Sequence, residues 1–161
     1  MKLNFINVDK VAEEIERKFL VVSDMYKSMA FRCSYIEQGY ISTDKGATIR
    51  IRNIDKKSVL TIKSRTFGLT RNEWEYQIPF EDAIEMLESI SKGRVIRKNR
   101  YYVNYSGHLW EIDEFIDHHM GLVVAEIELK AENETFSLPP FVGEEVTGNP
   151  IYYNSYLALN S

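Results

Sequence analysis

Residues 47–53 read Ala-Thr-Ile-Arg-Ile-Arg-Asn, and this stretch decides the fold because Arg50 and Arg52 alternate with isoleucines. In an extended strand, successive side chains point to opposite faces, so the stretch has one charged face and one apolar face. The alternation therefore predicts a β-strand whose apolar side packs on a core.

The same alternation, rich in β-branched and aromatic residues, recurs along the chain. It predicts eight strands, near 14–22, 34–42, 47–53, 58–65, 71–79, 95–105, 108–115 and 122–130. Short polar connections favour antiparallel neighbours. Helical spacing marks three further stretches, at 24–31, 80–91 and 150–159. The expected fold is mainly β (α+β): an eight-stranded antiparallel barrel whose apolar outer faces are covered by the helices 80–91 and 150–159.

Composition restricts both the architecture and the class of partner. With 161 residues, 44% of them hydrophobic, we expect one domain over 1–161, in which residues 1–12 form an N-terminal leader. A net charge of −4 disfavours a nucleic-acid partner. No apolar run approaches the roughly 18 residues of a membrane-spanning helix, so no membrane partner is expected. The single cysteine, Cys33, excludes an intrachain disulfide and fits the cytoplasm. The sequence leaves a homodimer open.

The charged faces of the strands carry like charges in pairs. Carboxylates are paired on some strands and cations on others, and such pairs cost stability when they lie close together. A ligand or ion of opposite charge would remove that cost. Two other interpretations stay open: an ordinary sheet whose charged face lies in water, and a structural ion-pair network inside a barrel. Periodicity alone does not say whether the charges point inward or outward.

An inward arrangement would join two kinds of chemistry. Carboxylate oxygens suit Mg²⁺ or Mn²⁺, and the sequence supplies them at Glu14, Glu16, Glu111, Asp113, Glu126 and Glu128. Lysine and arginine bind phosphate oxygens, and the sequence supplies them at Lys18, Arg50, Arg52, Lys63, Lys98 and Arg100. Together they would let a metal-activated water attack a terminal phosphorus.

Several short motifs occur in an order that is found in a known family. They are Glu14-Ile15-Glu16-Arg17-Lys18, Ile49-Arg50-Ile51-Arg52, Leu60-Thr61-Ile62-Lys63, Glu73-Trp74-Glu75, Trp110-Glu111-Ile112-Asp113 and Ala125-Glu126-Ile127-Glu128. The first matches the E-x-E-x-K signature of the CYTH superfamily, the triphosphate tunnel metalloenzymes. The chain resembles that superfamily over about residues 13 to 158, and is similar to its short bacterial inorganic tripolyphosphatases.

The resemblance implies a closed tunnel and assigns roles to its residues. The implied metal ligands are Glu14, Glu16, Asp113, Glu126 and Glu128. The implied phosphate ligands are Lys18, Arg50, Arg52, Lys63, Lys98 and Arg100. Further tunnel residues without an assigned role are Arg71, Glu73, Glu75 and Glu111. Lys18 and Glu16 are the expected catalytic residues, since they lie where metal, water and phosphate should meet.

The expected activity is hydrolysis of inorganic tripolyphosphate to pyrophosphate and phosphate, with Mg²⁺ or Mn²⁺ as cofactor. The alternatives within the superfamily are an adenylate cyclase and a nucleoside or thiamine triphosphatase. A triphosphate-binding module without catalysis is a further alternative, and metal-dependent phosphate release would distinguish the enzyme from it.

Overall fold

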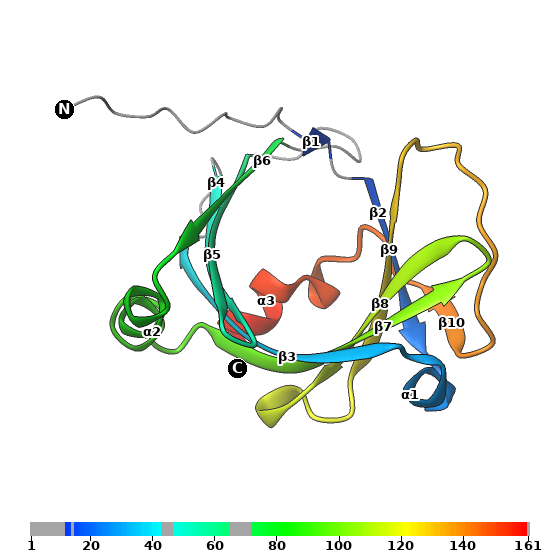
Figure 1. Cartoon of the computed structure of the whole chain (residues 1–161), viewed down its shortest axis with the longest axis horizontal. Helices are drawn as coiled ribbons and strands as arrows, with labels where there is room; N and C mark the ends of the chain where they lie inside the picture. The colour runs from blue at the N-terminus through cyan, green and yellow to red at the C-terminus, as the bar shows by residue number, and fades with distance from the viewer. Residues whose placement is uncertain (1–11, 14, 43–46, 65–71, 161) are drawn as a thin grey trace.

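One antiparallel sheet forms most of the molecule. The computed structural model describes residues 12–13, 15–42, 47–64 and 72–160. Ten strands follow one another in the order β1-β6-β5-β4-β3-β7-β8-β9-β2-β10. Their bounds are β1 Ala12–Glu13, β2 Ile15–Val21, β3 Arg32–Ser42, β4 Ala47–Ile54, β5 Lys57–Ser64, β6 Asn72–Ile78, β7 Val95–Tyr105, β8 His108–Phe115, β9 Val123–Leu129 and β10 Val142–Glu145. Figure 1 shows the sheet curled into a ring, which gives it an inner and an outer face.

The eight predicted strands are confirmed as β2 to β9, and the mainly antiparallel β class is confirmed with them. The strand count differs from the prediction because two short strands, β1 and β10, lie at the sheet edges. Ala12, the last residue of the predicted leader, lies in β1. Within the described residues the hydrogen-bonded ladder does not close into a barrel. The chain itself joins the two sides, since β1 pairs with β6 while β2, which begins two residues after β1 ends, pairs with β9.

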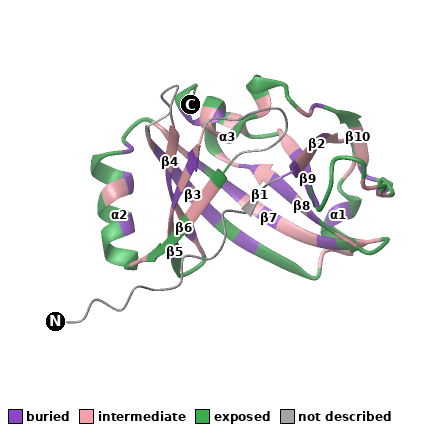
Figure 2. Cartoon of the chain, turned by 90° about the horizontal axis from the view of Figure 1, so that it is seen from above, coloured by how far each residue is buried: buried purple, intermediate pink, exposed green. Residues whose placement is uncertain are grey.

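Helices and loop residues cover the outer face. Helix α2 (Phe80–Ser89) lies outside the ring and buries Ala83 and Leu87 against Ile51 of β4, as the sequence predicted. Figure 2 shows that α2 is buried on the side that faces the strands and exposed on the other. Ile51 of β4 thus faces α2, so Arg50 and Arg52 on either side of it point into the ring.

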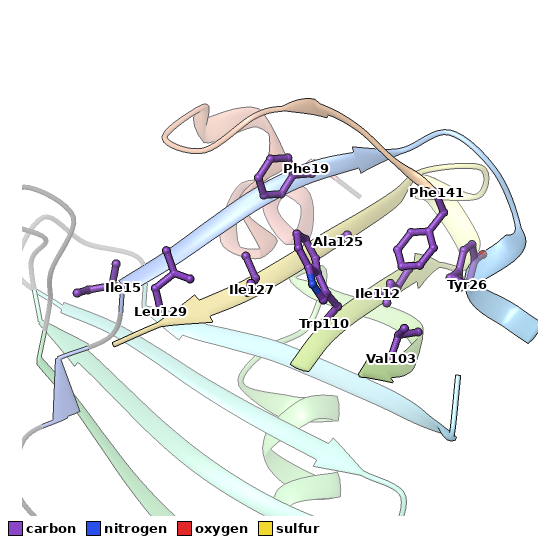
Figure 3. Packing of buried hydrophobic residues seen from close by; sticks show 10 residues of the cluster. All are labelled: Ile15, Phe19, Tyr26, Val103, Trp110, Ile112, Ala125, Ile127, Leu129 and Phe141. Carbon is purple, nitrogen blue, oxygen red and sulfur yellow. The ribbon is translucent and has the colours of Figure 1, made fainter. Parts of the chain in front are cut away.

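A larger apolar cluster covers the outer face of the opposite part of the ring. Trp110 and Ile127 are fully buried in it, and the ring centroid of Phe19 lies 5.6 Å from that of Trp110. At the other end of the cluster, Phe141 of the segment before β10 packs against Tyr26 of helix α1 (Met25–Met29) (Figure 3). Burying a side chain of this size stabilises the fold by about 1.5–3 kcal/mol. Both outer clusters therefore hold the sheet with its charged rows facing inward.

Helix α3 (Asn154–Leu159) lies on the inner side of the sheet, so its prediction as an outer cover is wrong. Its Leu157 and Ala158 pack against Tyr40, Ile96 and Phe115. Strand register places Tyr40 opposite Arg50 and Phe115 opposite Lys98, on the face that carries the site's charges. Figure 1 shows α3 within the outline of the ring. The physical reason is that the inward rows become apolar at one end of the sheet, so an apolar helix is buried there.

Two one-turn 3₁₀ helices complete the described fold, η1 (Asp117–His119) and η2 (Pro150–Tyr152). No helix among the described residues is long and apolar enough to span a bilayer.

Candidate functional site

The charged residues predicted from the sequence gather on the inner face of the sheet. Strand register places them side by side, with Lys18 opposite Glu126 and Arg100 opposite Asp113. They form two groups. The acidic wall lies on β2, β7, β8 and β9 and consists of Glu16, Lys18, Lys98, Arg100, Glu111, Asp113, Glu126 and Glu128. The arginine wall lies on β4, β5 and β6 and consists of Arg50, Arg52, Thr61, Lys63, Glu73 and Glu75.

Asp113 is the centre of the acidic wall and is completely buried. Its carboxylate accepts hydrogen bonds from Arg100 Nε and Nη2, both at 2.7 Å, and from Lys98 Nζ. Burial alone would raise the pKa of Asp113, but the charges of Arg100 and Lys98 hold it well below its usual range. Burial also lowers the pKa of Lys98 to about 8, with Arg100 acting in the same direction and Asp113 against it. This triad is a buried ion network whose members need one another.

Lys18 forms the second contact group of the acidic wall. Its ammonium lies 2.6 Å from Glu126 and 3.4 Å from Glu16. Burial opposes the charge of Lys18, but Glu126 and Glu16 outweigh it and raise the pKa of the lysine above its ordinary value. Lys18 is therefore a permanent cation at neutral pH, and cannot serve as a general base there.

The arginine wall is paired more loosely. Arg52 Nη2 lies 3.2 Å from Glu75, whereas Arg50 Nη2 lies 3.6 Å from Glu75 and 3.8 Å from Glu73. Thr61 connects them, because its hydroxyl accepts from Arg50 Nη2 at 3.1 Å and donates to Glu75 at 3.0 Å. Within the part of the chain that the structure describes, Arg50 Nε and Arg52 Nε are buried and have no hydrogen-bond partner.

Charges on the acidic wall affect the pKa of a residue on the arginine wall. Burial lowers the pKa of Arg52 to about 10, and the nearby charges of Arg50 and Arg100 act in the same direction. Glu111 of the acidic wall opposes this shift. Arginines that repel one another while donors remain unused form a site that an anion would stabilise.

Most of the predicted site residues therefore share one surface. Glu14 and Arg71 lie outside the described residues. Three contributors were not assigned from the sequence: Thr61, Tyr153 and Asn154. Thr61 lies at an inward position of a charged strand, so strand periodicity could have placed it in the site. Tyr153 and Asn154 come from outside the sheet, and strand periodicity gives no signal for them.

Oxygen donors suited to a hard cation lie at one end of the acidic wall. Glu16 and Glu128 are directly opposed on β2 and β9, and Glu126 lies on the same face. A divalent ion between opposed glutamates would offset their repulsion, so the chemistry of this donor set fits Mg²⁺ or Mn²⁺. The described residues do not include Glu14. Among them, no three acidic or histidine side chains lie close enough together to hold a metal ion.

A groove of about 710 Å³ lies elsewhere, on the outer face between α2 and β7. Its lining includes Leu87, Arg97 and His118 and none of the residues of the two walls. Arg97 is already engaged there by Glu37 and Asp117 at 2.7 and 3.2 Å. The groove is therefore separate from the candidate site, despite its size.

Comparison with known proteins adds independent information. A family model described as the CYTH domain matches residues 12–155. An inorganic triphosphatase of Acetivibrio thermocellus is 46% identical over 150 residues, which cover 93% of this chain and 96% of that protein. An inorganic triphosphatase of Nitrosomonas europaea is 36% identical over 151 residues, with coverages of 91% and 97%. A solved structure of an inorganic triphosphatase has a TM-score of 0.66 at 34% identity, and covers 92% of this chain and 95% of its own.

Proposed function

This chain belongs to the CYTH family, and on that premise we propose that it hydrolyses inorganic tripolyphosphate to pyrophosphate and phosphate on the inner face of its sheet. The observation that carries the proposal is the arginine wall, where the Nε–H groups of Arg50 and Arg52 are buried without a partner among the described residues. Buried donors on charged groups are costly unless a ligand accepts their hydrogen bonds. The two curated relatives named inorganic triphosphatases support the choice of ligand.

Tripolyphosphate fits the arginine wall of this surface. Among the described residues, six cations lie on the inner face beside seven carboxylates, so the triphosphate, with about four negative charges near neutral pH, needs the arginine donors and the positive charge of a bound divalent metal. In the proposed complex, Arg50 and Arg52 hold the phosphate chain with bidentate guanidinium contacts, and Lys63 contributes a third cation from β5. Lys98 and Arg100 add positive charge from the opposite wall. The inward-pointing side chains of the two walls include few groups that could recognise a nucleobase, so binding energy is concentrated on phosphate.

Lys18 and Glu16 carry the proposed catalytic step. The oxygen of a water forms a bond to the terminal phosphorus while the bond from that phosphorus to the bridging oxygen breaks, and pyrophosphate leaves. Lys18 stabilises the charge that develops on the transferred phosphoryl oxygens, because Glu126 and Glu16 raise its pKa and keep it a cation near neutral pH. Glu16, 3.4 Å from the lysine, orients the water and accepts its proton.

The proposed cofactor is Mg²⁺ or Mn²⁺, in keeping with the general metal dependence of CYTH triphosphatases. Glu16, Glu126 and Glu128 would hold it, with Glu14 and Asp113 as the remaining expected ligands. When bound, such an ion supplies positive charge to phosphate oxygens and makes a coordinated water more acidic. The cytoplasm is the proposed compartment. The absence of a nucleic-acid partner remains a prediction, and a homodimer remains an open alternative.

Phosphate release measured by a malachite-green assay tests the proposed function. The panel contains tripolyphosphate, pyrophosphate, ATP and thiamine triphosphate, each with Mg²⁺ or Mn²⁺ and each repeated in excess EDTA. We expect tripolyphosphate to have the highest kcat/KM and EDTA to abolish its turnover. An equal or higher kcat/KM for ATP, or cyclic AMP as the main product, would assign a nucleotide-directed enzyme instead. Triphosphate binding without turnover would indicate a binding module.

A further inference from the structure

The first turn of α3 reaches two lysines that lie on different strands of the acidic wall. Asn154 Oδ1 accepts a hydrogen bond from Lys98 Nζ at 3.1 Å. The neighbouring Tyr153 places its ring centroid 5.8 Å from Lys18 Nζ. A segment outside the sheet thus contacts two of the cations proposed to act on the substrate.

The position of Asn154 is fixed without help from Lys98. Further along the helix, Leu157 and Ala158 are buried against the apolar end of the inner face. The Leu157 carbonyl oxygen also lies 2.8 Å from His119 Nε2 of η1. Because these contacts dock the helix, Asn154 presents its amide oxygen as a preset acceptor, and the lysine side chain adjusts to it.

Lys98 is held between two acceptors that together orient its ammonium group. Its ammonium is fully buried, and its other strong polar contact is the carboxylate of Asp113, which Arg100 already neutralises. The ring of Phe115 lies on a further side, 5.5 Å from Nζ. An ammonium has three donors. Without Asn154 its remaining strong contact is Asp113 alone, whereas the amide oxygen engages a second donor and so fixes the direction of the ammonium group.

We propose that Asn154 is a positioning residue, which orients the Lys98 ammonium so that Lys98 can serve the phosphate chain. Asn154 itself does not touch the substrate. The inference rests on the proposed function, since it assigns a role to Lys98 in that reaction. Tyr153 supports the same arrangement on the β2 side by packing its ring near Lys18.

A double-mutant cycle between Asn154→Ala and Lys98→Met tests this positioning role on the full-length protein. We expect Asn154→Ala to lower kcat/KM for tripolyphosphate about tenfold in the natural sequence, the scale of one lost hydrogen bond to a charged group. In the Lys98→Met background the same substitution should change kcat/KM less than about twofold, because the group it positions is gone. Asn154→Asp keeps the acceptor oxygen and should restore kcat/KM to within about threefold of the natural protein.

Controls separate positioning from simple support of α3. Ser155→Ala alters the next residue of the same helix and should leave kcat/KM unchanged. Thermal unfolding reports whether any variant loses its fold. Equal losses from Asn154→Ala in both backgrounds, or no loss in the natural sequence, would overturn the inference. If the natural protein released no phosphate from tripolyphosphate, the proposed function would fail, and the same cycle measured by calorimetric binding of imidotriphosphate would still test the coupling.

Discussion

The two walls of the inner face use the same residue types in opposite ways. In the acidic wall, Asp113 binds Lys98 and Arg100 at once, and Lys18 lies 2.6 Å from Glu126. In the arginine wall, the contacts of Arg50 with glutamates are 3.6 Å or longer, and buried Nε–H groups have no partner among the described residues. Asp113 and its two cations satisfy one another, whereas the two arginines of the arginine wall have hydrogen-bonding capacity left for a ligand.

This difference shows how one sheet can be stable and still bind an anionic ligand. Buried charges are tolerated when each has a close partner, as in the acidic wall. Residual repulsion between Arg50 and Arg52 keeps the arginine wall ready for an anion, at a modest cost in stability. Removal of Asp113 from the acidic wall should therefore damage the fold, whereas substitutions in the arginine wall should mainly reduce binding.

The largest effect is expected for Lys18, the member of the acidic wall with a proposed catalytic role. Lys18→Ala should lower kcat for tripolyphosphate about 10²–10³-fold, as loss of a preorganised electrostatic contact to the transition state does. Lys18→Arg, which keeps the charge, should retain more activity. Steady-state kinetics with saturating metal provides the measurement. A change confined to KM would show that Lys18 only binds the substrate.

Asp113 tests the contrast in stability. Asp113→Ala leaves Lys98 and Arg100 buried without their carboxylate, and should lower the free energy of unfolding by about 3–5 kcal/mol. The matched change in the arginine wall is Glu75→Ala. Because the Glu75 side chain is 44% exposed, its removal should cost about 1 kcal/mol or less. Urea denaturation of both variants measures the difference, and equal losses would contradict the distinction between the walls.

A smaller effect concerns the acid limb of stability. Burial would raise the pKa of Glu126, but Lys18 and Arg100 outweigh it, so the pKa lies below the ordinary 4.5. A carboxyl with a lowered folded pKa contributes stability that is complete above its unfolded pKa and is lost as pH falls toward the folded value. The free energy of unfolding should therefore decrease below about pH 4.5. Glu126→Gln should make that decrease shallower, and an unchanged slope would rule out this contribution.

Much of the fold could be predicted because strand periodicity is a local property. The alternation of Arg50 and Arg52 with isoleucines predicts both β4 and its two faces, and the same rule located every strand from β2 to β9. The short edge strand β10 was missed, since Val142–Glu145 is too brief to show a period. Strand closure depends on long-range pairing, which periodicity does not report.

The location of α3 shows where local reasoning ends. Its apolar residues predicted a packed helix, but Tyr153, Tyr156 and Leu159 remain more than 40% exposed, while Leu157 and Ala158 are buried. Helix α3 packs on the inner face of the sheet because some inward-pointing residues of the strands are apolar. Asn154 enters the site only because of that docking. Its contact with Lys98 could not be predicted from either segment alone.

The most direct test of the account compares two arginines on opposite faces of the sheet. Arg52 belongs to the arginine wall, whereas Arg97 lies on the outer face and is paired with Glu37. Calorimetric titration with imidotriphosphate in the presence of Mg²⁺ should show that Arg52→Met weakens binding about 10–100-fold, the scale of a lost charge-assisted contact. Arg97→Met should change the dissociation constant less than about twofold. Unchanged binding by Arg52→Met, or an equal loss from Arg97→Met, would contradict the inner face as the phosphate site.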